Sequence, residues 1–249
     1  MQTLAEHLAA APFTLVMSSG FFGFFAHAGM LSALEDNGLL PVRVGGSSAG
    51  ALVGGLWASG RSTGAIASEL SALRRSDFWD PKLGLGLLRG DLFRALLEQN
   101  LGAKHFDQCR VPAFACAYDV VSRRVRAFDR GPLAPALHAS CAVPGMFQPV
   151  FIEGRPYVDG GVSDRPGLSG AGDEERVFFH HLSSRSPWRA KGSDALKIPT
   201  RGRMTTLVIA DLPRVGPFRL EVGRLAFARA REATREALSR VVTGPVVTV

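Results

Sequence analysis

Lysine is scarce in this chain of 249 residues: only four of its 29 basic residues are lysines, and the rest are arginines. Against 22 acidic residues, the formal net charge is +7. The arginines are spread along the chain without interleaved aromatic residues or a nucleic-acid-binding motif, which argues against nucleic acid as a partner. A basic surface of this kind remains compatible with an anionic membrane or with simple solubility.

Cysteine is also rare. Cys109, Cys116 and Cys141 are an odd number, are widely spaced and form no CxxC pair. Neither a disulfide framework nor a zinc site is therefore expected, and we predict buried thiols in a reducing compartment. No metal and no cofactor are expected from the sequence.

Charged residues are absent from residues 8–34, so a signal peptide or a membrane span had to be considered. The start of the chain has Glu6 and no basic residue, and a span would have to include Pro12, Gly20 and Gly23. Both features disfavour a targeting or transmembrane segment. The sequence predicts a cytoplasmic protein or one that contacts membranes peripherally.

No internal repeat or low-complexity linker divides the chain, and 46% of its residues are hydrophobic. This length and composition suffice for one large core. The 28 glycines and 15 prolines separate short apolar runs in the manner of alternating strands and helices. We therefore predict a single α/β domain over residues 1–249.

The expected elements follow from hydrophobic periodicity. Residues 77–89 (DFWDPKLGLGLLR) are apolar and punctuated by glycine, and predict a lid or a wall. Strands are predicted at 13–17, 42–44, 113–121, 125–128, 177–182 and 205–212, with two short ones in 149–159. Helices are predicted at 25–37, from the glycine-rich turn to 58, at 63–73, 91–100 and 133–140, and as a closing helix at 219–241.

One strand-to-helix turn carries a candidate nucleophile. Gly46-Ser47-Ser48-Ala49-Gly50 fits G-x-S-x-G, the pattern of a nucleophile elbow, with Val42 and Val44 before it and an Ala/Gly-rich segment after it. Small neighbours allow the strand and helix to approach closely, and the serine hydroxyl then points away from the sheet at a helix N-terminus. Ser48 is the candidate nucleophile, with Gly46 and Gly50 as the glycines of the elbow.

A nucleophilic serine needs a base, and the sequence offers two kinds. Asp159 ends a short predicted strand and precedes Gly160 and Gly161. With a reference pKa near ~3.9, an aspartate is ionised at neutral pH and can accept a serine proton directly. His180 and His181 follow in the chain, so a Ser-His-Asp carboxylesterase stays open. Both histidines lie inside the apolar run VFFHHL, however, where one is expected to face inward and the other outward.

Three segments of the chain resemble the patatin-like phospholipase family: FAHAGMLSALEDNG after the first glycine-containing loop, GGSSAGALVGGLWASG, and ASCAVPGMFQPVFIEGRPYVDGGVSDRP. The resemblance extends from about residue 15 to residue 166. It implies a three-layer α/β/α fold with a mainly parallel sheet, and a lipid acyl hydrolase of the phospholipase A or esterase type. Ser48 would be the nucleophile, Asp159 the base and a phospholipid or other lipid ester the substrate, with an acyl-serine intermediate and no metal in the dyad.

The first loop departs from the family pattern G-G-G-x-Arg/Lys-G. It reads Ser18-Ser19-Gly20-Phe21-Phe22-Gly23, without a basic residue. Because backbone N–H groups can form an oxyanion hole regardless of side chain, Ser19, Gly20 and Phe21 are the expected donors. The altered loop also leaves open a catalytically impaired lipid-binding or scaffold protein with the same fold.

Phenylalanines gather beside this loop. Burying an apolar side chain of this size stabilises a fold by roughly 1.5–3 kcal/mol, so these residues are expected either in the core or along an acyl-chain pocket. A basic surface would add attraction to anionic phospholipid. The candidates for the pocket wall are Phe22, Phe24, Phe25 and Leu85.

Overall fold

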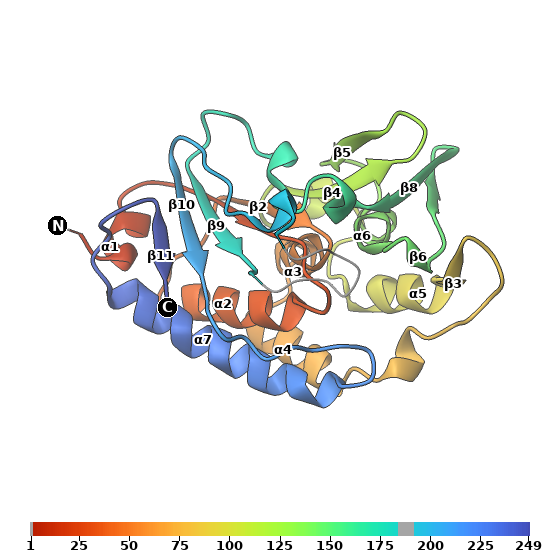
Figure 1. Ribbon diagram of the computed structural model, residues 1–249, viewed down its shortest axis with the longest axis horizontal. Coiled ribbons are helices and arrows are strands. Elements are labelled where there is room, and N and C mark those ends of the chain that lie inside the picture. The colour runs from red at the N-terminus through yellow and green to blue at the C-terminus, as the bar shows by residue number, and fades with distance from the viewer. Residues whose placement is uncertain (1, 184–191) are drawn as a thin grey trace.

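The computed structural model describes residues 2–183 and 192–249 and shows a mixed α/β protein built on a central sheet (Figure 1). Its strand order is β11-β10-β9-β1-β2-β4-β8-β7, with β5 paired to β4. All pairs from β11 to β4 are parallel, whereas β5, β7 and β8 join antiparallel. The predicted α/β class and mainly parallel sheet are therefore confirmed.

The strands of this sheet are short and mostly buried, as expected for parallel strands. A separate two-stranded sheet pairs β3 (Gly86–Leu88) with β6 (Gly145–Phe147). The strands of the large sheet are β1 (Thr14–Met17), β2 (Arg43–Ser47), β4 (Ala113–Asp119), β5 (Arg124–Phe128), β7 (Val150–Ile152), β8 (Arg155–Asp159), β9 (Val177–His181), β10 (Met204–Val208) and β11 (Val246–Thr248).

The helices agree with the predicted segments to within a few residues at each end. The closing helix is shorter than predicted and packs along α2, beneath the sheet in Figure 1. The bounds are α1 (Leu4–Ala9), α2 (Phe24–Asp36), α3 (Ala49–Ala58), α4 (Thr63–Ala72), α5 (Asp91–Asn100), α6 (Leu133–Cys141) and α7 (Gly223–Ser239). Short 3₁₀ turns include η1 (Arg75–Asp77), η3 (Gly160–Val162) and η4 (Leu168–Gly170).

The two faces of the sheet are covered unequally. Alternate strand residues such as Leu15 and Met17 join the main core formed with the helices, whereas Val16 joins a smaller cluster. That smaller cluster also contains Phe114 and Phe179, and Leu168 of η4 packs against it. Within the described part of the chain, helices α2, α3, α6 and α7 therefore contribute to one core, and a 3₁₀ turn covers the opposite face.

The sequence did not predict α1, β3, β6 or β11. Each of these strands spans three residues, too short for a period-2 pattern to be recognised. None of the described helices is long and apolar enough to cross a membrane.

Parallel strands of an open α/β sheet bring their carboxyl ends to one edge, where ligands usually bind. Strands β1 and β2 both end there, each followed directly by a loop or turn and a helix. Next to them, β4 pairs with β8 so that Ala117 lies opposite Asp159. The first loop, the elbow and the candidate base thus meet at this edge.

Candidate active site

The turn between β2 and α3 holds Ser48 in an unusual backbone conformation, with φ 53° and ψ −118°. Positive φ is uncommon for a residue other than glycine and costs free energy, so surrounding contacts must fix it. Gly46 and Gly50 make the turn possible: a Cβ atom on either would lie 2.0 Å from the carbonyl oxygen of Met17. Only glycine permits this close approach of the elbow to β1.

Ser48 and Asp159 are directly hydrogen-bonded. The Ser48 hydroxyl donates to Asp159 Oδ2 over 2.5 Å, and the Gly161 N–H donates to Asp159 Oδ1 over 2.7 Å. Ser48 is 8% exposed and Asp159 is 4% exposed. Gly160 lies against β4, where an added Cβ would be 2.2 Å from the Cys116 carbonyl oxygen. The sheet register thus delivers an oriented carboxylate to a buried serine.

A second serine supports the elbow and was not identified from the sequence. The Ser48 backbone N–H donates to Ser140 Oγ over 2.9 Å, and the Ser140 hydroxyl donates to the Cys116 carbonyl over 2.6 Å. Ser140 is fully buried in α6. It therefore links the strained turn to β4. Its place in the ASCAVPG segment was visible in the sequence, but nothing there indicated what it would contact.

The loop after β1, which lacks the basic residue of the family pattern, is held by hydrogen bonds to distant parts of the chain. The Leu182 N–H donates to Ser18 Oγ over 2.9 Å, and His27 Nε2 donates to the Ser18 carbonyl over 2.7 Å. The Ser19 N–H donates to the Arg165 carbonyl over 2.7 Å, and the buried Arg165 guanidinium donates to the Leu182 carbonyl. Ser19 was predicted as an oxyanion donor, but its N–H is engaged by Arg165.

The two histidines of β9 lie inside the protein. His180 is 0% and His181 1% exposed, so the prediction that one of them faces outward is wrong. The physical reason is that β9 lies between β1 and β10 and is covered on both faces. His180 Nδ1 lies 2.9 Å from His27 Nδ1, so this ring is directed at His27 rather than at the serine–aspartate pair.

Burial also keeps these imidazoles uncharged. Desolvation is the main cause that lowers the pKa of His27 to about 4 and that of His180 well below its usual range. Because His27 Nε2 donates to a carbonyl, its neutral Nδ1 accepts, and His180 Nδ1 must be the donor of their shared hydrogen bond. Both rings are thereby fixed as structural partners of the first loop.

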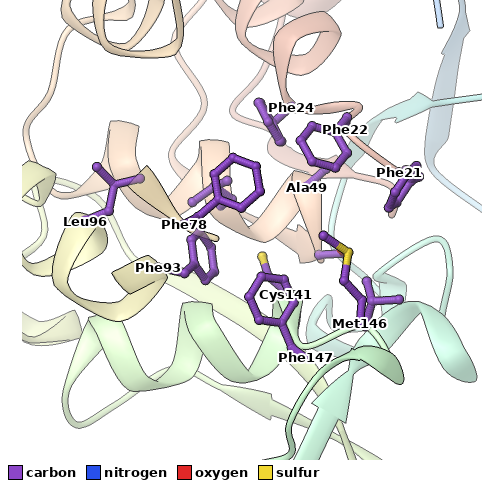
Figure 2. A pocket seen from close by; sticks show the side chains of 14 residues that line it. Phe21, Phe22, Phe24, Ala49, Phe78, Phe93, Leu96, Cys141, Met146 and Phe147 are labelled. Atoms are coloured by element: carbon purple, nitrogen blue, oxygen red, sulfur yellow. The ribbon is translucent and has the colours of Figure 1, made fainter. Parts of the chain in front are cut away.

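An apolar pocket opens beside Ser48 (Figure 2). Phe22 and Phe24 line it, as predicted from the sequence, together with Gly20 and Phe21 of the same loop. Figure 2 shows further rings facing them across the cavity, from α5 and β6. The remaining lining residues are Ser48, Ala49, Leu52, Phe78, Phe93, Leu96, Cys141, Val143, Met146 and Phe147.

Two predicted pocket residues lie elsewhere. Phe25 is 2% exposed and packs where α7 begins, so that a Cβ on Gly223 would lie 2.4 Å from its ring. It follows Phe24 in a helix, and successive helical residues point in different directions. Leu85 is 82% exposed on the segment before β3. Of the predicted lid or wall at residues 77–89, it is Phe78 that reaches the pocket.

Cys141 lines the pocket next to the nucleophile. Burial, with Asp159 nearby, raises the pKa of its thiol well above the usual range, so the group is a neutral thiol at neutral pH. The sequence predicts buried cysteines, and this holds for Cys116 only, since Cys109 and Cys141 are partly exposed. Nothing in the sequence places Cys141 at the site. The wall beside Ser48 is thus apolar in character and carries no competing charge from this residue.

The fold and the site define a mixed α/β protein with a serine–carboxylate pair at a strand-to-helix turn, next to an apolar pocket. The family model for patatin-like phospholipase matches residues 15–171. The chain belongs to the patatin-like phospholipase family.

Relatives in sequence are members of the NTE group. The chain is 34% identical over 153 residues to an uncharacterized NTE family protein of Mycobacterium bovis, covering 60% of this chain and 42% of that protein. It is 30% identical over 244 residues to lysophospholipase NTE1 of Mycosarcoma maydis, covering 81% of this chain and 12% of that protein. The chain thus spans less than half the length of either relative.

Two solved structures share the fold. VipD from Legionella pneumophila superposes with a TM-score of 0.65 at 13% identity, over 91% of this chain and 66% of VipD. The type III effector protein ExoU gives a TM-score of 0.50 at 16% identity, over 91% of this chain and 52% of ExoU. At these identities the likeness concerns the fold alone.

Proposed function

We propose that this protein is a lipid acyl hydrolase of the phospholipase A or esterase type, using Ser48 as nucleophile and Asp159 as base. The observation that carries the proposal is the 2.5 Å hydrogen bond from the Ser48 hydroxyl to Asp159 Oδ2 at a strained elbow. A nucleophile within hydrogen-bond reach of a base that is itself oriented by a third group is the signature of covalent catalysis. Here the orienting group is the Gly161 N–H.

The proposed reaction proceeds through an acyl-serine. Asp159 Oδ2 accepts the proton of Ser48 Oγ as that oxygen attacks the ester carbonyl carbon. The tetrahedral intermediate expels the alcohol, which takes the proton from Asp159. A water molecule then attacks the acyl-serine while Asp159 accepts its proton, and that proton returns to Ser48 as the fatty acid leaves. No histidine takes part in these proton transfers.

The proposed oxyanion donors are the N–H groups of Gly20 and Phe21. Both residues line the pocket together with Ser48, so their backbone is next to the ester carbonyl of a bound substrate. Backbone donors already in place stabilise the developing negative charge without having to reorganise. Arg165 is then a positioning residue, because its carbonyl accepts from the Ser19 N–H and its guanidinium donates to Leu182, whose N–H in turn donates to Ser18 Oγ.

Replacing Arg165 by methionine tests this positioning role. We expect kcat to fall by roughly tenfold, less than the effect of losing an oxyanion donor outright, with KM almost unchanged. Arg176→Met is the matched control, because Arg176 also donates to backbone carbonyls, such as that of Ala11 over 2.6 Å, but precedes β9 at the other end of the sheet. Steady-state kinetics on a soluble ester distinguishes the two variants. A kcat for Arg165→Met equal to that of Arg176→Met contradicts the positioning role.

The pocket supports an acyl chain as the group bound next to Ser48. Nine of its 14 lining residues are phenylalanine, leucine or methionine, and four of the other five are glycine, alanine, valine and cysteine. Apolar chains gain roughly 25 cal/mol for each Å² of surface removed from water, whereas a charged head group would lose hydration there. We therefore propose that a phospholipid or other lipid ester places its acyl chain in this pocket, with peripheral contact between protein and membrane.

The altered first loop favours a second candidate, a lipid-binding or scaffold protein with impaired catalysis. A fluorophosphonate probe separates the two, since it labels only an activated serine. We expect labelling of the wild-type protein and none of Ser48→Ala, while Ser163→Ala, an exposed serine near the base, is labelled as wild type. Mass spectrometry locates the adduct. An unlabelled wild-type protein that still binds vesicles contradicts the hydrolase and supports the scaffold.

A further inference from the structure

A short hairpin carries two fully projecting leucines. Residues 80–89, here called the leucine hairpin, are closed by hydrogen bonds from the Arg89 N–H to the Asp80 carbonyl and from the Lys82 N–H to the Leu87 carbonyl, each 3.0 Å. The segment leading into β3 forms the right-hand edge of the molecule in Figure 1. The hairpin therefore has a defined shape: Leu88 near its end is buried in the main core, and its tip projects from the protein.

Its tip is apolar and has a lysine beside it. Leu83 is 99% exposed and Leu85 is 82% exposed. Lys82 immediately precedes these leucines, whereas Asp80 begins the hairpin and Arg89 at its end forms an ion pair with Asp91 over 2.5 Å. Exposed apolar side chains next to a cation form a pattern that inserts into the boundary between headgroups and acyl chains of an anionic bilayer.

The hairpin is fixed to the wall of the pocket. Gly86 pairs with Gly145 and Leu88 with Phe147, and the Gln148 N–H donates to the Leu88 carbonyl over 3.0 Å. A Cβ on Gly86 would lie 2.3 Å from the Phe147 backbone, so glycine is required for this close contact. Since Phe147 lines the pocket, the segment with the exposed leucines leads directly into the small sheet that forms part of the pocket wall.

We propose that the leucine hairpin is the element that docks the protein on an anionic phospholipid bilayer, with Leu83 and Leu85 inserted among the lipids. Lys82 then lies at the level of the phosphate groups. Docking through this element would bring the β3–β6 sheet, and hence the pocket entrance, to the membrane surface. The inference deepens the proposed function by naming the surface through which lipid is reached.

The size of the tip favours a lipid surface over another protein. A standard protein interface buries roughly 800 Å² on each partner, far more than a tip with two exposed leucines offers. A bilayer needs no complementary surface, because it accommodates any apolar side chain that enters it. The adjacent Lys82 also matches the charge of an anionic membrane rather than an apolar protein groove.

Vesicle binding by the catalytically silent Ser48→Ala protein tests the proposal apart from hydrolysis. We expect Leu83→Ser/Leu85→Ser in that background to lower its affinity for phosphatidylglycerol–phosphatidylcholine vesicles at least about tenfold, since each leucine no longer leaves water. Leu40→Ser/Val42→Ser is the matched control. Both residues are about half exposed, 52% and 51%, and they precede β2, where the parallel strands have their amino-terminal ends. Cosedimentation with vesicles provides the measurement.

Unchanged vesicle affinity in the Leu83→Ser/Leu85→Ser protein overturns the proposal. A second result would also overturn it. If the Leu83→Ser/Leu85→Ser protein no longer self-associates in sedimentation velocity but keeps its vesicle affinity, the hairpin binds a second copy of the chain. With Ser48 intact, the double variant should hydrolyse p-nitrophenyl butyrate at the wild-type rate but vesicle phospholipid more slowly. If the wild-type protein hydrolyses neither substrate, the proposed function fails, and the vesicle-binding comparison still decides the docking surface.

Discussion

Asp159→Asn is expected to lower kcat by at least about 10³-fold, a loss at the upper end for a positioned general base. The asparagine side chain keeps the shape of the carboxylate and can still accept from the Gly161 N–H, but it cannot take a proton from Ser48. The buried pair offers no bulk water as a replacement base, since Ser48 is 8% and Asp159 4% exposed. Turnover of a soluble p-nitrophenyl ester measures the effect.

Histidine variants provide the control for the dyad. A Ser-His-Asp triad requires roughly 10⁴-fold loss when its histidine is removed. The dyad predicts turnover close to wild type for His181→Asn and, because His180 supports the first loop through His27, a loss of no more than about tenfold for His180→Asn. Because both histidines are buried, kcat should be normalised to the fraction of protein that a fluorophosphonate labels. A loss for either histidine variant as large as that for Asp159→Asn would contradict the dyad and restore the triad.

The two dyad residues could be identified from sequence because each lies in a motif that also determines its own backbone. The G-x-S-x-G segment specifies the close approach to β1 through Gly46 and Gly50, and the glycines after Asp159 allow the turn that orients its carboxylate. Local sequence therefore indicated both halves of the site. Only the pairing of β8 with β4 shows how 111 residues of separation become a 2.5 Å contact.

Other parts of the site could not be predicted, because they depend on contacts between distant segments. Nothing near Ser19 in the sequence indicates that Arg165 takes its N–H, or that Ser140 accepts from the Ser48 N–H. Phe24 and Phe25 are adjacent and chemically identical, and only the packing of α2 against α7 decides which one reaches the pocket. Periodicity predicts elements, but it does not predict which side chains meet across them.

Three buried histidines, His27, His138 and His181, predict a steep loss of stability in acid. Burial lowers the pKa of His27 and His181 to about 4 and, together with the positive charge of Arg94, that of His138 to about 3, against an ordinary value of 6.5. Between pH 6.5 and about 4 the unfolded chain thus binds more protons than the folded one, so the free energy of unfolding falls as the pH falls. Each such histidine contributes up to about 1.4 kcal/mol per pH unit inside that window, or on the order of 5 kcal/mol for the three between pH 6.5 and 5.

His27→Gln isolates one of these contributions. The glutamine amide can still donate to the Ser18 carbonyl, but the site no longer titrates. We expect the slope of unfolding free energy against pH, measured by urea denaturation between pH 6.5 and 5, to fall by about 1.4 kcal/mol per pH unit. His105→Gln, a substitution at an exposed histidine, is the matched control. Equal slopes in wild type and His27→Gln would mean that His27 is protonated as readily in the folded protein as in the unfolded chain. Our assignment of His27 and His180 as a neutral, hydrogen-bonded pair that fixes the first loop would then be wrong.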